Sequence, residues 1–139
     1  RSTSPAYCYY DNDIKNAETY GALYNWYVAS DNRELISGFH VPSEKEWYVL
    51  AERLGGLSVA GGAMKEAGFT HWIQPNKGAT NSSGFTGLPA GARQGKFDNL
   101  GDWNIFWSKD KFFGMPNVGS TFALGEIWAQ LTDGGCYNW

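Results

Sequence analysis

Two segments in the first third of the chain carry apolar residues at helical spacing. In residues 16–30, aromatic and aliphatic side chains recur three and four positions apart, which predicts a helix that buries one face. In the second segment, Ser43 and Glu46 form the S-x-x-E pattern of a capping box, so a helix is predicted to begin directly after Ser43. Gly55 and Gly56 can adopt the left-handed backbone conformation that ends this helix.

The rest of the chain has weaker periodicity. One short helical turn is predicted at 64–67, and turn-forming residues predict a long ordered loop over 68–84. Short strands rich in apolar and aromatic residues are predicted at 85–88, 103–108 and 126–131. Because no repeat, linker or change of composition divides the sequence, we expect a single domain over residues 1–139.

Composition favours an exported binding module. Aromatic residues make up 17% of the chain and charged residues only 18%, so some rings are expected at the surface. The net charge of −3 and the scattered basic residues argue against nucleic acid as a partner. No apolar run is long enough for membrane insertion, and the first residues lack a signal-peptide pattern, so we expect a processed chain that is secreted or attached to the cell surface.

The two cysteines lie near opposite ends of the chain. Cys8 and Cys136 suit a disulfide that joins the termini of an exported domain, but they equally suit two free buried thiols. Both alternatives remain open at this point.

Five segments together resemble one bacterial family. They are AYCYYDND at 6–13, ETYGALYNWYVAS at 18–30, GFHVPSEKEWYVL at 38–50, GATNSSGFTGLPAGAR at 78–93 and FWS at 106–108. In this order they resemble the Fibrobacter succinogenes major paralogous domain. The resemblance implies export and display on a bacterial cell surface.

The stretch VPSEKEW at 41–47 is also similar to a helix start in formylglycine-generating-enzyme-like proteins, whose fold is a variant of the C-type lectin fold. The two resemblances imply an α+β, C-type-lectin-like domain. Its two helices would flank a small antiparallel sheet beside a long loop-rich region. After Trp128 and Leu131 the family's closing strand has no counterpart here, so this strand is missing, diverged or supplied by a neighbouring chain.

The sequence predicts no enzyme. An oxidase of the formylglycine-generating type would need a reactive cysteine pair, and neither Cys8 nor Cys136 belongs to a paired motif. His40 and His71 stand outside any zinc-binding pattern and are expected to be structural. No G-x-S-x-G elbow presents a serine nucleophile. We therefore expect a non-catalytic protein without a cofactor or metal.

Calcium is the one ion whose binding the sequence does not argue against. The acidic segment 11–13 does not continue as an EF-hand loop, because Asn16 and Ala22 stand where glycine and glutamate are required. The segment 74–76 is faintly similar to a calcium motif of lectins, whereas 102–104 has the accompanying residues in the wrong order. Asx-type turns explain these segments as well.

The chain is rich in aromatic and amide side chains after residue 100, and these are the candidate ligand-binding residues. They are Trp103, Asn104, Phe112, Phe113, Trp128, Gln130, Tyr137, Asn138 and Trp139. Rings can stack on sugars or anchor protein interfaces, and amides add directional hydrogen bonds. We expect an extracellular binding or adhesion module for a glycan or a surface protein. The alternative is a structural subunit of a filament or surface layer that self-assembles through strand or aromatic contacts.

Overall fold

The structure is a computed structural model that describes residues 4–31, 36–112, 119–125 and 129–133, the last range by its backbone alone. Its elements follow the chain in this order: β1 (Tyr7–Cys8), η1 (Tyr10–Asn12), α1 (Lys15–Tyr20), β2 (Leu23–Tyr24), α2 (Trp26–Ala29), α3 (Glu44–Arg53), α4 (Leu57–Met64), β3 (Ala90–Gln94), β4 (Lys96–Leu100), β5 (Asn104–Lys111), β6 (Gly119–Leu124) and β7 (Ala129–Asp133). No helix in these ranges is both long and apolar enough to cross a membrane.

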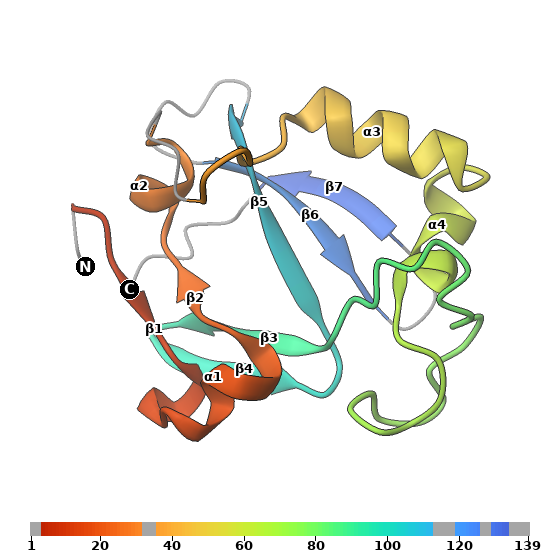
Figure 1. The fold of residues 1–139 in the computed structure, drawn as a ribbon, viewed down its shortest axis with the longest axis horizontal. Helices are drawn as coiled ribbons and strands as arrows, with labels where there is room; N and C mark the ends of the chain where they lie inside the picture. Colours follow the sequence, from red (N-terminus) through yellow and green to blue (C-terminus); the bar gives the residue numbers. More distant parts are fainter. Residues whose placement is uncertain (1–3, 32–35, 113–118, 126–128, 134–139) are drawn as a thin grey trace.

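The strands form two sheets. The small sheet pairs β1 and β2 antiparallel, and the large sheet has the order β4-β3-β5-β6-β7. Its central pair, β3 and β5, is parallel and meets only where Gly91 lies opposite Asn104. Figure 1 shows β3 and β5 spreading apart from this point, with β1, β2 and α1 near β3 and β4, and with the helices α3 and α4 beside β6 and β7.

The expected C-type-lectin-like fold, with two helices flanking a small antiparallel sheet, is wrong. The described residues form four α-helices and two sheets, and the larger sheet is mixed because it contains the parallel pair β3 and β5.

The helix predicted at 16–30 is split in two. Gly21 leaves helical geometry with a φ of 73° and ends α1, after which β2 runs extended. Asn25 then starts α2, because its side chain accepts a hydrogen bond from the N–H of Val28. The same Asn25 Oδ1 accepts from the N–H of Ala6 at 3.1 Å, and its Nδ2 donates to the carbonyl of Ser4 at 2.9 Å. One buried side chain therefore both caps a helix and holds the N-terminal segment.

The capping box predicted for the second helix is confirmed. The hydroxyl of Ser43 accepts from the N–H of Glu46, and the carboxylate of Glu46 accepts from the N–H of Ser43. The helix α3 ends at Arg53, and Gly55 and Gly56 follow with φ values of 99° and 95°. The local sequence is sufficient to define both ends of this helix.

Trp47 of α3 lies at the centre of the core. Its ring stacks on Phe122 of β6 with centroids 4.7 Å apart and planes 4° apart, and it also lies 5.5 Å from the ring of Phe106. The buried side chains around it come from α3, α4, β6 and the long loop. They are Ala51, Ala60, Met64, Trp72, Phe122 and Leu124. The core therefore joins the two longer helices to the sheet.

The short turn predicted at 64–67 is replaced by the earlier helix α4, which contains two glycines. Gly62 allows the helix to approach the long loop closely, since a Cβ built there would lie 2.2 Å from the carbonyl oxygen of Gly78. The N–H of Thr80 donates to the carbonyl of Gly62 at 2.8 Å in the same contact. Close backbone packing therefore outweighs the low helix propensity of glycine.

The strand predictions were partly correct. The strand at 103–108 is confirmed as β5, and the one at 126–131 overlaps β7, although 126–128 lie outside the described residues. The strand at 85–88 is wrong, because only Gly87 forms an isolated bridge, with Lys65. The sequence reasoning missed β3, β4 and β6. All six residues of β6 are buried, so the strand has no alternation of apolar and polar residues to detect.

We predict that Asn25→Ala lowers the free energy of unfolding by roughly 1–3 kcal/mol, because the helix cap and the contacts to Ala6 and Ser4 are lost together. Urea denaturation measures the change. Asn25→Asp keeps the acceptor but sets a buried carboxylate oxygen against the Ser4 carbonyl, so it should be destabilising as well. Equal stability of Asn25→Ala and the wild type would contradict the role assigned to this side chain.

We predict that Gly62→Ala is destabilising, by about 1–3 kcal/mol, although the same change in an open helix is stabilising by about 1 kcal/mol. The added methyl group would meet the Gly78 carbonyl, which is backbone and cannot rotate away. Ser58→Ala, at an exposed position of the same helix, is the control and should be neutral or stabilising. A stabilised Gly62→Ala protein would show that the close approach is unimportant.

Candidate functional site

A pocket of about 440 Å³ lies where β3 and β5 diverge. It is lined by 104–107 of β5, 90–92 of β3, 22–24 and 28–29 around β2 and α2, 40–42 before α3, and by Tyr20 and Trp47. The volume falls within the range of small-ligand sites. The pocket therefore draws on both halves of the chain.

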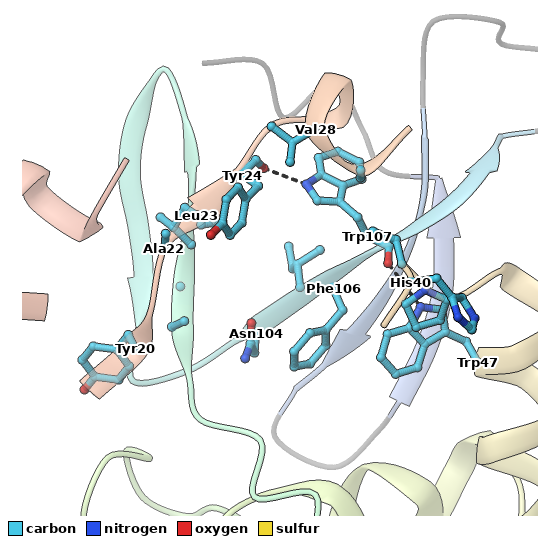
Figure 2. A pocket seen from close by; sticks show the side chains of 17 residues that line it. Tyr20, Ala22, Leu23, Tyr24, Val28, His40, Trp47, Asn104, Phe106 and Trp107 are labelled. Carbon is cyan, nitrogen blue, oxygen red and sulfur yellow. Dashed lines mark hydrogen bonds between the residues drawn. The ribbon is translucent and has the colours of Figure 1, made fainter. Parts of the chain in front are cut away.

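Two tryptophans tie the walls of the pocket together (Figure 2). The indole Nε1 of Trp107 donates to the carbonyl of Tyr24 at 2.7 Å, and the Nε1 of Trp47 donates to the carbonyl of Trp107 at 3.3 Å. Both indole N–H groups are therefore satisfied by protein backbone, and the rings present carbon surface to the space between them.

Four of the lining side chains are polar: Tyr20, Tyr24, His40 and Asn104. Figure 2 shows Tyr20 and His40 on opposite sides of the pocket, with Asn104 between them beside Phe106. The Nδ2 of Asn104 donates to the carbonyl of Leu88 at 2.5 Å, which fixes the orientation of the amide. The pocket is thus an apolar space with one oriented amide and three polar groups around it.

His40 is held at the pocket by the capping box of α3. Its Nε2 lies 2.9 Å from Oε1 of Glu46, whose other oxygen accepts from the N–H and the hydroxyl of Ser43 at 2.8 and 2.7 Å. These contacts lower the pKa of Glu46 to about 2, with the Ser43 N–H as the largest cause, followed by the Ser43 hydroxyl and His40. Glu46 is therefore a carboxylate near neutral pH.

The predicted ligand residues are only partly assembled here. Asn104 lines the pocket, whereas Trp103 and Phe112 are half-buried beside or beyond it. The side chain of Gln130 is not described, although its backbone lies in β7. The remaining predicted residues lie outside the described part of the chain: Phe113, Trp128, Tyr137, Asn138 and Trp139. Their role stays a prediction.

The sequence reasoning missed the N-terminal contribution to the pocket. Tyr20, Tyr24 and Val28 were interpreted as the buried stripe of one helix, yet they lie on three different elements that face the pocket. Gly21 was the available signal, since a glycine in a predicted helix interior often marks its end. No local sequence pattern indicates that these elements lie beside β5.

Residues 1–124 match the family model described as the Fibrobacter succinogenes major domain. The chain belongs to this family. The resemblance found in the sequence is thereby confirmed, and the match covers every residue that lines the pocket. Neither the curated proteins nor the solved structures include a match to the chain. The family's description names no activity, so the function of this Fibrobacter succinogenes major domain has to be inferred from its site.

The family match leaves the disulfide untested. Cys8 lies half-buried on β1, and burial raises the pKa of its thiol, while Arg93 acts in the opposite direction. Cys136 lies beyond the family match and outside the described residues. The bond between Cys8 and Cys136 therefore stays a prediction.

Within the described ranges of this family member, no three acidic, histidine or cysteine side chains gather as metal ligands. Asp13 uses its Oδ1 to accept from the N–H of Lys15 at 2.9 Å, which is an Asx-type turn. His71 contacts the Glu66 carboxylate at 2.9 Å and packs edge-to-face with the Tyr20 ring. Calcium binding stays an untested prediction.

We predict that stability falls as the pH drops from about 5 to about 2, and that Glu46 contributes to this loss. The pKa of Glu46 is lower in the folded chain than the usual 4.5, so its contribution is present above that value and is lost as the pH falls towards 2. In Glu46→Gln this contribution is absent, so its free energy of unfolding should vary less with pH. Glu52→Gln, on the same helix, is the control and should follow the wild type; parallel curves for all three proteins would refute the prediction.

Proposed function

We propose that the chain is a non-catalytic, extracellular binding module of a bacterial cell surface, which recognises a protein by taking up one of its apolar side chains in the pocket. The observation that carries this proposal is the lining of the pocket. Rings of Trp47, Phe106 and Trp107 face small and aliphatic residues of β2, α2 and β3. Such a lining favours an apolar group over a charged one.

The pocket suits an apolar group better than a sugar ring, because its lining is mostly apolar and its polar groups besides Asn104 are those of Tyr20, Tyr24 and His40. A buried pyranose would bring several hydroxyl groups, each of which costs free energy unless it finds a hydrogen-bond partner. The indole N–H groups of Trp47 and Trp107 already donate to backbone carbonyls, and Nδ2 of Asn104 donates to Leu88. An aromatic or aliphatic side chain has no such requirement, and buried anchors of this type dominate the energy of many protein interfaces.

The titratable groups near the pocket favour binding over catalysis. The raised pKa of Cys8 disfavours the thiolate that a cysteine nucleophile needs. The low pKa of Glu46 makes this carboxylate a weak base, and His40 pairs with it rather than with a hydroxyl or thiol nucleophile. The proposed export and surface display rest on the family resemblance seen in the sequence.

The proposal predicts that N-acetyl-tryptophanamide and N-acetyl-leucinamide bind in the pocket and that N-acetyl-serinamide does not. Amide chemical shifts in NMR titrations should change at residues of β3 and β5. Ala22→Phe places a ring in the pocket and should weaken binding by about tenfold or more. Ala67→Phe, at an exposed position on the long loop, is the matched control. Shifts confined to other surfaces, or unchanged affinity in Ala22→Phe, would refute the proposal.

A further inference from the structure

Three tyrosines lie together on one face of the small sheet. Tyr7 lies opposite Tyr24, and Cys8 lies opposite Leu23. Since successive side chains of a strand point to opposite faces, Tyr7, Tyr24 and the extended residue Tyr9 share one face, and Cys8 and Leu23 share the other. We call the face formed by Tyr7, Tyr9 and Tyr24 the tyrosine platform.

The rings of the tyrosine platform touch one another and remain accessible. Tyr7 lies 5.8 Å from Tyr9 in an edge-to-face arrangement and 6.1 Å from Tyr24 with tilted planes. Tyr7 is 61% exposed and Tyr24 is 46% exposed, so both rings are open to solvent although they pack together. Their mutual contacts restrict the rings before any ligand arrives, so binding loses less side-chain entropy.

The hydroxyl groups of the platform also gather. The pKa of Tyr9 is raised by removal from solvent first, and then by Tyr7 and Tyr24, with a hydrogen bond between Tyr9 and Tyr7. The electrostatic influence of Tyr7 and Tyr24 on Tyr9 indicates that the three phenol groups lie close together. The surface therefore combines ring faces with uncharged donors and acceptors.

We propose that the tyrosine platform is a second binding site, which binds a neutral glycan. The C–H face of a pyranose can stack on an exposed ring of Tyr7 or Tyr24, while the sugar hydroxyls exchange hydrogen bonds with the phenol groups. A protein side chain of aliphatic character would leave these hydroxyls unused, and an acidic glycan would find no cation among the platform residues. This site adjoins the pocket through Tyr24, which also lines the pocket, but Tyr7 and Tyr9 lie outside the pocket lining, and the site takes a different ligand.

The platform can be tested with cellohexaose, mannohexaose, chitohexaose and the acidic hexagalacturonate, by NMR titration and calorimetry. At least one neutral hexasaccharide should bind and shift the amide signals of β1 and β2, whereas hexagalacturonate should not. Tyr7→Ala should weaken binding by about tenfold, which corresponds to the loss of one aromatic contact. Tyr48→Ala, which removes a 48% exposed tyrosine of α3, is the matched control and should leave the affinity unchanged.

Two milder variants keep the proposal testable if Tyr7→Ala does not fold. Tyr7→Phe and Tyr9→Phe keep the rings and remove single hydroxyls, so each should weaken binding by a smaller factor than Tyr7→Ala. Absence of binding by every neutral hexasaccharide overturns the proposal, as does unchanged affinity in these platform variants. N-acetyl-tryptophanamide, titrated into the same variants, reports on the pocket, because Tyr7 and Tyr9 do not line it. The two proposals can therefore fail separately.

Discussion

The stack of Trp47 on Phe122 is the contact on which the rest of the structure depends. It joins α3 to β6 with two parallel rings 4.7 Å apart, and the indole N–H of the same Trp47 reaches the carbonyl of Trp107 on β5. The capping box fixes where α3 begins and hence where Trp47 lies along it. Because one wall of the pocket is also part of the core, the pocket is formed before a ligand arrives, and its shape is as rigid as the packing behind it.

The pocket exists because β3 and β5, two neighbouring strands of the large sheet, pair at one position and then diverge. Gly91 is the one residue of β3 in register with β5, and a Cβ there would lie 2.6 Å from the carbonyl of Asp98 and 2.8 Å from the Tyr10 ring. Its φ of 67° turns β3 away from β5 in a conformation that favours glycine. Residues around β2 and α2 then line the space between β3 and β5. The divergence of β3 from β5 at Gly91 thus provides the space for the proposed binding site.

The parts of this fold that could be predicted are those determined by residues close together in the sequence. The capping box and Gly55–Gly56 define α3 within a dozen residues, and the aromatic run around Trp107 indicates β5. The helix over 16–30 was mispredicted because a periodic pattern concealed the break at Gly21. The pocket itself depends on contacts such as that between Trp107 and Tyr24, which are 83 positions apart, and no sequence pattern records such a pairing. The same holds for the tyrosine platform, whose members meet only through the register of β1 and β2.

Tyr24 joins the two proposed sites physically. Its carbonyl receives the indole N–H of Trp107 inside the pocket, while its ring packs beside Tyr7 on the platform. A ligand that shifts the Trp107 ring therefore changes a hydrogen bond to the strand that carries Tyr24, and a ligand on the platform contacts the Tyr24 ring of the same strand. Coupling of this kind requires only that each ligand binds more tightly when β2 is in one of two positions than when it is in the other. A short strand with a single partner strand is the element of this fold best placed to show such a difference, because few hydrogen bonds hold it in one position.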